Sequence, residues 1–267
     1  MAVAVPIAPT RPRHVVWGLV AAAITVQILY PLMPEPWRTP VTVTSVVVFC
    51  LASLADIGRV HGAKGVLSLI AAAGVGGLLA ESIGVATGFP FGQYSYTGTL
   101  GPELAGVPVV VPMAWVMMAW PALVVGRTLA RNGLAVVLVA AFALTAWDVF
   151  LDPQMVGAGH WIWSDPQDGL PLVPGIPLSN YAGWLLVSTV VMSLLNWALP
   201  RPAAPSWPAA TLYLWVYFSS VLGHAAFFGL PGSAVTGGVL MGAVAVPFAI
   251  SMARFARRRE PMIEDTT

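Results

Sequence analysis

The sequence predicts an all-α polytopic membrane protein with about eight transmembrane helices, and three observations support this. The chain of 267 residues is 58% hydrophobic and only 9% charged, whereas a soluble domain carries about 25% charged residues. Its apolar residues fall into eight runs, each near the roughly 20 residues that a helix needs to cross a bilayer. Basic residues lie almost entirely on one side of these runs. Lipid is therefore expected to cover most of the surface.

The eight runs define the predicted helices in order along the chain. They extend over residues 14–32, 41–57, 65–84, 108–125, 133–151, 181–199, 208–230 and 233–253. Proline-rich breaks separate several of them, as at 31–36 and 200–205. The runs and their connections use up the length, so we expect a single transmembrane domain over 1–267, with disordered tails at about 1–11 and 257–267.

Basic residues set the predicted orientation. Those before the first run, between runs two and three, between runs four and five, after run six and after run eight are Arg11, Arg13, Arg59, Lys64, Arg127, Arg131, Arg201, Arg254, Arg257, Arg258 and Arg259. Only Arg38 falls on the other side. Since loops rich in Lys and Arg stay in the cytoplasm, we predict a multi-pass protein of the cell membrane with both termini inside. An odd number of helices would spoil this partition.

Two long loops on the outer side, over 85–107 and 152–180, echo each other. In each, a Gly-[Val/Ile]-Pro triplet is followed at the same spacing by a tryptophan, Trp115 or Trp184. Proline is tolerated in the first turn of a helix, so each triplet is predicted to open an inward-running helix. The third and fourth helices would then form a parallel repeat of the fifth and sixth. Coincidence is the alternative explanation.

Composition and absent motifs exclude several function classes. A net charge of +1 gives no reason to expect nucleic acid binding, and the single cysteine, Cys50, excludes an internal disulfide and a cysteine-based metal site. The sequence has no phosphate-binding Walker loop and no dinucleotide glycine motif. The sole lysine, Lys64, lies in a predicted inner loop, so a retinal Schiff base within the membrane is not expected.

Ionisable residues in the apolar runs are the strongest functional signal. Asp148 and Asp152 lie four residues apart on one helix face, and Glu81 occupies a similar place near the end of the third run. A charge at the bilayer centre costs roughly 2.5–3.5 kcal/mol, so such residues are usually functional. At 1.5 Å per residue, Glu81, Asp148 and His224 each lie roughly 23 Å from the inner face. These groups could therefore meet in one cavity.

Each of these residues also has a purely structural interpretation. Glu81 could be a helix-end acid among lipid headgroups, and Asp152 could start a turn before its proline. His224 could be a core histidine bonded to Tyr217 or to the backbone. Asp56 precedes Arg59 near the cytoplasmic end of the second helix, where a surface ion pair suffices, so we leave it out of the predicted site.

Aromatic residues concentrate in the outer loops. They include Phe89, Phe91, Tyr94, Tyr96, Trp161 and Trp163. They are typical of the aromatic belt at a membrane interface. They also suit the lining of a pocket for a long conjugated or isoprenoid chain, where ring faces stabilise a nearby cation.

The outer loops and their flanking helices resemble a known family. The first block comprises Glu81-Ser-Ile-Gly84, Thr87-Gly88, Phe91-Gly92-Gln-Tyr94, Tyr96, Leu100-Gly101-Pro102, Gly106-Val-Pro108 and Trp115. The second comprises Asp148, Asp152-Pro153, Trp161-Xaa-Trp163, Gly175-Xaa-Pro177, Asn180-Tyr181 and Gly183-Trp184. Over about residues 80–185 the chain resembles the carotenoid biosynthesis integral membrane proteins that include the CruF-type carotenoid hydratases.

The resemblance implies a hydratase (a hydro-lyase) that adds water to the terminal carbon–carbon double bond of an acyclic carotenoid end and gives a tertiary alcohol. It implies a redox-neutral reaction without an organic cofactor, and we predict no metal site. The expected partners are a carotenoid or other isoprenoid substrate, membrane lipid and other carotenoid enzymes.

The residues permit this reaction. We assign Asp148 as the acid, Glu81 as the group that orients water, Asp152 as able to take either role, and His224 as a proton relay. The expected substrate-binding residues are Phe91, Tyr94, Tyr96, Trp115, Trp147, Trp161, Trp163, Asn180 and Trp184.

Two other functions remain open from the sequence. A carotene cyclase would use the same protonation but capture the cation with an internal double bond. A proton-coupled transporter or a carotenoid-binding scaffold would not be an enzyme. A transporter would also need acids along the inner halves of the helices, where the sequence has few.

Overall fold

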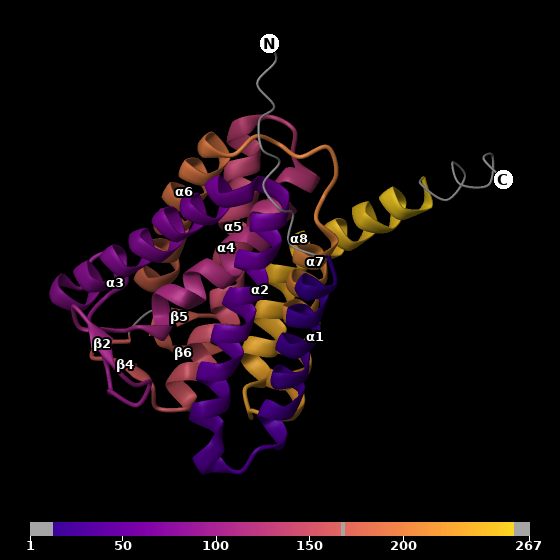
Figure 1. Cartoon of the computed structure of the whole chain (residues 1–267). Coiled ribbons are helices and arrows are strands. Elements are labelled where there is room, and N and C mark those ends of the chain that lie inside the picture. The colour runs from indigo at the N-terminus through magenta and orange to yellow at the C-terminus, as the bar shows by residue number, and fades with distance from the viewer. Residues whose placement is uncertain (1–12, 167–168, 259–267) are drawn as a thin grey trace.

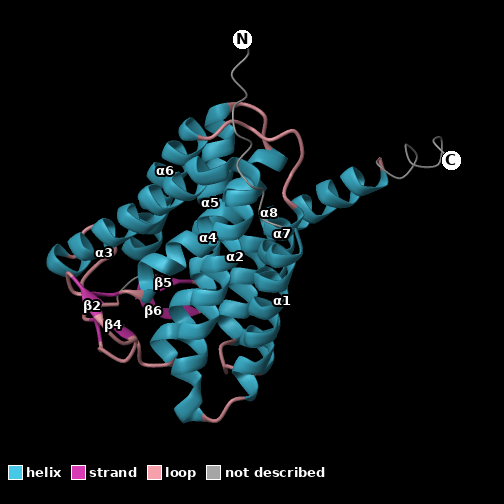
Figure 2. Cartoon of the chain, viewed as in Figure 1, coloured by secondary structure: helices cyan, strands magenta, loops and turns pink. Residues whose placement is uncertain are grey.

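A computed structural model describes residues 13–166 and 169–258, which form one helical bundle (Figure 1). Its helices are α1 (Arg13–Leu29), α2 (Glu35–Leu69), α3 (Gly76–Thr87), α4 (Val110–Leu129), α5 (Gly133–Gly157), α6 (Leu178–Ala198), α7 (Trp207–Ala226) and α8 (Pro231–Arg257). A short 3₁₀ turn, Tyr30–Leu32, follows α1. Strands occur only in the two long loops of the described chain (Figure 2).

The fold is the predicted one, an all-α polytopic membrane protein. Six stretches are long and apolar enough to cross a membrane: 13–32, 35–87, 110–129, 133–157, 178–198 and 231–257. Helix α7 is not among them. The predicted disordered tail over 1–11 lies outside the described residues. So does the part of the predicted tail over 257–267 that follows Arg258.

The second and third predicted helices are joined differently from the expectation. Instead of a loop over 58–64, α2 continues through a π-helical segment, Ile70–Val75, into α3. Gly62 breaks this 53-residue run with φ +63° and ψ −156°, a conformation that glycine adopts with little cost. At 1.5 Å per residue the run measures roughly 80 Å, far more than the roughly 30 Å of a bilayer core. The Gly62 break therefore separates two crossings.

The two predicted hairpins share one order of elements. Between α3 and α4 lie β1 (Tyr94–Tyr96), β2 (Glu103–Leu104) and β3 (Val107–Pro108); between α5 and α6 lie β4 (Trp161–Trp163), β5 (Gly169–Leu170) and β6 (Val173–Pro177). In each loop the last two strands form a small antiparallel hairpin, and β1 pairs with β4 in antiparallel fashion. Pro108 ends β3 and Pro177 ends β6. Helices α4 and α6 therefore begin after these prolines, whereas the sequence had suggested that the helices begin at them.

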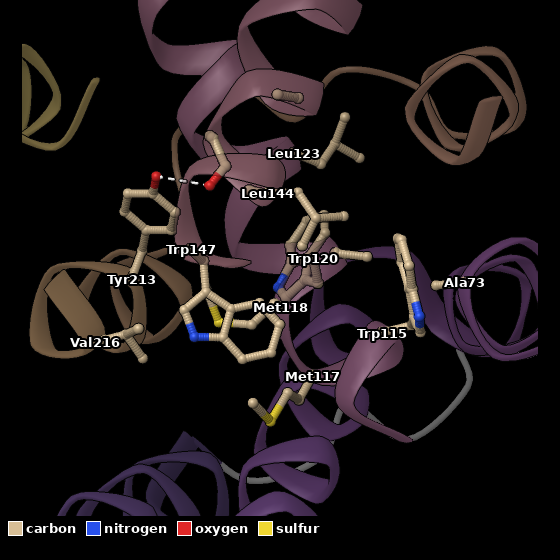
Figure 3. Close-up of a cluster of buried hydrophobic side chains, with 14 of the residues drawn as sticks. Ala73, Trp115, Met117, Met118, Trp120, Leu123, Leu144, Trp147, Tyr213 and Val216 are labelled. Carbon is tan, nitrogen blue, oxygen red and sulfur yellow. Dashed lines mark hydrogen bonds between the residues drawn. The ribbon is translucent and has the colours of Figure 1, made fainter. Parts of the chain in front are cut away.

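Helix α4 is the centre of the bundle. Every residue from Trp115 to Arg127 is buried. Figure 3 shows its side chains Trp120 and Leu123 packed near Leu144 of α5, and Tyr213 of α7 donating a hydrogen bond of 3.0 Å to the carbonyl of Ala143. These contacts fix α4, α5 and α7 relative to one another.

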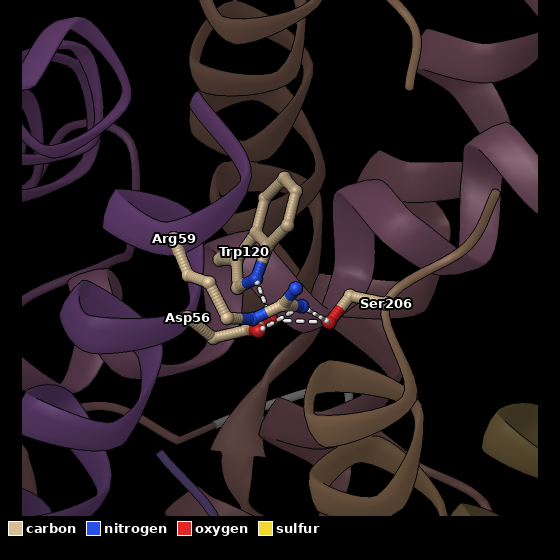
Figure 4. A network of polar contacts seen from close by, with 4 residues as sticks. All are labelled: Asp56, Arg59, Trp120 and Ser206. Carbon is tan, nitrogen blue, oxygen red and sulfur yellow. Dashed lines mark hydrogen bonds and ion pairs between the residues drawn. The ribbon is translucent and has the colours of Figure 1, made fainter. Parts of the chain in front are cut away.

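Asp56 forms the ion pair with Arg59 that the sequence suggested, but it does so in the interior and not at the surface. Its side chain is fully buried in α2 and bonds to groups from three elements (Figure 4). One oxygen accepts from the indole of Trp120 at 2.8 Å and from Ser206, the N-cap of α7, at 2.5 Å. The other faces Arg59 at 2.9 Å. The network ties α2, α4 and α7 together at the end of the bundle where the basic residues lie.

That end of the bundle carries the predicted basic side. Five arginines from α4, α8 and the loops between helices line one open hollow: Arg127, Arg131, Arg201, Arg254 and Arg258. Which side of the membrane this end faces stays a prediction.

Candidate active site

Glu81 of α3 is buried and held by three donors. The hydroxyls of Tyr94 and Tyr96 donate to its Oε2 at 2.5 and 2.9 Å, and the indole of Trp115 donates to its Oε1 at 3.1 Å. Both carboxyl oxygens are therefore fixed in place. Burial raises the pKa of Tyr94 and of Tyr96 in the loop between α3 and α4, so both hydroxyls keep their protons and remain donors.

Two glycines of α3 let the aromatic donors approach. A Cβ at Gly77 would lie 2.7 Å from the ring of Trp115, and one at Gly84 would lie 2.9 Å from the hydroxyl of Tyr94. Such distances are too short for carbon, so a larger residue would push these donors away from Glu81. Gly84 belongs to the Glu81-Ser-Ile-Gly84 motif of the family resemblance, but the sequence alone does not indicate this packing role.

Asp148 and Asp152 share a single amide on α6. The nitrogen of Asn180 donates to Oδ2 of Asp148 at 2.9 Å and also to Oδ2 of Asp152. The indole of Trp161 donates to Oδ1 of Asp152 at 3.2 Å. Helix α5 continues through Pro153 to Gly157, so Asp152 belongs to the helix and does not start a turn. Oδ1 of Asp148 is buried without a hydrogen-bond partner.

A cavity of about 60 Å³ lies between Glu81 and Asp152, among α2, α4, α5, α6 and the paired strands. Glu81, Asp152 and Asn180 lie on its wall. The predicted aromatic residues that line it are Phe91, Tyr94, Tyr96, Trp115, Trp161, Trp163 and Trp184. Most of the remaining lining is aliphatic, including Leu100, Val110, Leu151 and Met155, which no sequence pattern distinguishes from ordinary core.

The pairing of β1 with β4 brings the aromatic residues of both loops together. The rings of Tyr94 and Trp163 lie 5.7 Å apart, and those of Tyr96 and Trp161 lie 5.8 Å apart. All four are at most partly exposed. All four also line the cavity.

Glu81 and Asp148 occupy matching positions in the two hairpins. Ser95 and Ile162 face each other at the centre of the paired strands. Glu81 precedes Ser95 by 14 residues, and Asp148 precedes Ile162 by the same 14. The repeat thus contributes one buried carboxyl from each copy, while Asp152 has a valine, Val85, at the matching position.

His224 and Trp147 lie outside this cavity. The imidazole of His224 bonds to Ser233 of α8 at 2.6 Å and packs edge-on against Phe150 and Phe228. Its partner is therefore neither Tyr217 nor a carboxyl, and it does not join the acids as the depth estimate had suggested. Trp147 contacts Trp184 at 6.0 Å between ring centroids and faces a second cavity.

Two polar residues near the site were not among the site residues predicted from the sequence. Tyr181 follows Asn180, and its hydroxyl is buried without a partner. His160, just before β4, is buried and lies 2.8 Å from the hydroxyl of Thr99, which fastens one loop to the other. Within residues 13–166 and 169–258, no group of three His, Cys, Asp or Glu side chains is arranged to hold a metal ion.

Comparison with known proteins gives two matches. The family model described as carotenoid biosynthesis protein matches residues 40–244. A bisanhydrobacterioruberin hydratase from Haloarcula japonica is 35% identical over 126 residues, which are 45% of this chain and 41% of that relative. The match thus spans less than half of the relative's length. No solved structure matches the chain.

Proposed function

Because the chain belongs to the carotenoid biosynthesis protein family, we propose that it adds water to the terminal carbon–carbon double bond of an acyclic carotenoid end group. The product is a tertiary alcohol. The observation that carries this proposal is a set of buried carboxyl groups, from two copies of one hairpin, around a cavity whose remaining wall is almost entirely apolar and aromatic. The likeness to a hydratase supports the same reaction type.

Hydration of the carotenoid end requires an acid beside an apolar carbon–carbon double bond. Protonation of the less substituted carbon of a trisubstituted alkene leaves a tertiary carbocation on its neighbour. Water adds to that carbon, and loss of one proton from the added water gives the alcohol. The balance is one water gained, with no change in oxidation state. Two carboxyl groups as close as Asp148 and Asp152 repel each other when both are ionised, so a proton held between them is available for transfer.

We assign the donating role to Asp152, with Asp148 behind it. Asp152 lies on the cavity wall, whereas Asp148 is fully buried and does not line the cavity. The bond from Asn180 to both carboxyl groups positions them for exchange of a proton. Asp148, which the sequence favoured as the acid, then acts as the positioning residue and proton reserve.

We assign Glu81 as the proton acceptor, opposite the aspartate pair that donates the proton. Its three hydrogen bonds all come from donors, which favours a carboxylate that orients water and takes its proton. The ring faces of the lining aromatics stabilise the transient cation. The proton taken by Glu81 returns to the aspartate pair through water between turnovers.

Expression in a host that makes lycopene, followed by mass analysis of the pigments, tests the proposal. The wild type should yield products heavier by one water per converted end. Asp152→Asn and Glu81→Gln should each abolish that gain while the protein stays in the membrane fraction. Wild-type conversion by both variants would remove these residues from the chemistry.

The same experiment separates the alternatives. A cyclase would give an isomer of unchanged mass, and a binding protein would retain pigment without converting it. Reporter fusions at the two termini test the proposed topology, in which both ends lie in the cytoplasm of a cell with this protein in its cell membrane.

A further inference from the structure

A second cavity adjoins the first. It has a volume of about 320 Å³ and lies among α1, α2, α4, α5 and α7. Four side chains line both cavities, namely Thr42 and Val46 of α2 and Leu151 and Met155 of α5. The two spaces are therefore neighbours across a narrow strip of wall, and not separate hollows at distant points of the surface.

The second cavity suits an uncharged hydrocarbon. None of the described residues that line it is acidic or basic. Its wall is mainly aliphatic and aromatic, and Figure 3 shows three of the residues that line it, Met117 of α4, Trp147 of α5 and Val216 of α7. The polar side chain of Gln27 is already paired with the indole of Trp215 at 2.7 Å.

Size distinguishes the two cavities. Pockets for drug-sized ligands measure about 300–1,000 Å³. The first cavity, with about 60 Å³, lies far below that range, so it suits at most an end group and not a whole carotenoid. The second cavity, with about 320 Å³, falls within the range. An end group in the first cavity therefore leaves the rest of a long chain to be placed, and the adjoining apolar space is where it can go.

We propose that the second cavity binds the polyene chain of the substrate while the reacting end lies between Glu81 and Asp152. This inference rests on the proposed function. The chain would pass between the α2 and α5 side chains that both cavities share. Trp147 then contacts the chain near the reacting end, which gives this residue a substrate-binding role away from the carboxyl groups.

Filling the second cavity tests the inference. Ser219 of α7 and Ser45 of α2 line it and take no part in the chemistry. Ser219→Trp and Ser45→Phe should each lower conversion of a full-length acyclic carotenoid at least tenfold. Val239→Trp is the matched control, because Val239 lies on α8, is 68% exposed and lines neither cavity. It should convert like the wild type.

Pigment that remains bound to the purified proteins provides a second readout that needs no turnover. The wild type and Val239→Trp should retain lycopene, measured by absorbance, and Ser219→Trp should retain at least fivefold less. Equal conversion and equal retention by Ser219→Trp and the wild type would overturn the inference, as would a wild type that binds no pigment. If pigment binds as expected but gains no water, the proposed reaction fails while the chain-binding cavity stands.

Discussion

The indole rings of Trp115 and Trp184 stack face to face, with centroids 4.1 Å apart and planes inclined by 12°. These are the tryptophans that follow the two Gly-[Val/Ile]-Pro triplets, so the repeat places matching residues in contact. Trp115 also holds Glu81, and Trp184 touches Trp147. The stack therefore connects the carboxyl side of the first cavity with the wall of the second.

Trp115→Phe should impair the reaction more than the fold. The phenyl ring can still stack on Trp184, but Glu81 loses one of its three donors. A hydrogen bond to a charged group contributes about 1.5–3 kcal/mol, so we expect conversion to fall roughly ten- to a hundredfold. The measurement is the initial rate of water addition by membranes with equal amounts of protein.

Trp184→Phe is the matched control for that change. It removes an indole from the same stack, and the described residues give its nitrogen no hydrogen-bond partner. Because Trp184 lines the first cavity, some loss of rate is expected, but it should be clearly smaller than that of Trp115→Phe. Equal losses in the two variants would assign the effect to packing and not to Glu81.

Asn180→Leu should uncouple the two aspartates. The leucine has a similar volume but cannot donate to Asp148 and Asp152, and loss of a partner leaves buried polar groups at a cost of about 1–3 kcal/mol. We expect loss of detectable conversion and a lower unfolding temperature in detergent. Asn180→Gln, which keeps the amide, should recover part of the stability; recovery of full activity by the leucine variant would contradict the assigned role.

Asp56→Ala should destabilise the protein without changing the chemistry. The substitution leaves Trp120, Ser206 and Arg59 without their shared carboxylate (Figure 4). Removing one member of a buried ion pair costs about 3–5 kcal/mol. Thermal unfolding in detergent should shift clearly downward, while the rate per folded molecule should match the wild type. A selective loss of rate at normal stability would point to an unrecognised role at this end.

His224→Asn should leave the reaction almost unchanged. Asparagine can keep a hydrogen bond to Ser233 at the position of the imidazole Nδ1, and the acids do not contact this histidine. We expect conversion within about twofold of the wild type. A loss of conversion similar to that of Asp152→Asn would restore the proton relay that the sequence suggested.

His160 should make the two paired loops sensitive to acid. Burial lowers the pKa of this imidazole below its ordinary value, so below about pH 6.5 the unfolded chain binds a proton that the folded protein does not. Stability is thus full above that pH and is lost as the pH falls toward the lowered pKa of the folded state. Unfolding temperatures measured from pH 8 to pH 5 should decline more for the wild type than for His160→Gln. Parallel curves would contradict this.

The sequence predicts the membrane fold and the buried acids because both can be recognised from the order of residues along the chain, without knowledge of contacts between distant residues. Apolar length reports a crossing, and an acid within it is costly wherever the helix points, so Glu81, Asp148 and Asp152 stand out. The spacing of Trp115 and Trp184 after their triplets likewise predicts the repeated hairpin.

The features that the sequence does not predict depend on how each helix is rotated about its axis and on residues that are distant in the sequence. His224 has the depth of the acids, but its helix turns it toward Ser233. Asp56 has a basic neighbour in the sequence, yet its burial depends on Trp120 and Ser206, which are 64 and 150 residues away. The connection through Gly62 was missed because charges around it suggested a loop.

Two copies of a hairpin can change independently of each other. Glu81 and Asp148 occupy matching positions, but one is surrounded by three donors and the other lies beside a second acid with a shared amide. In a symmetric assembly of identical subunits, any substitution that adapts one acid to its role would also change the equivalent acid in the other subunit. Because both copies lie on one chain, one can specialise in giving protons while the other specialises in receiving them.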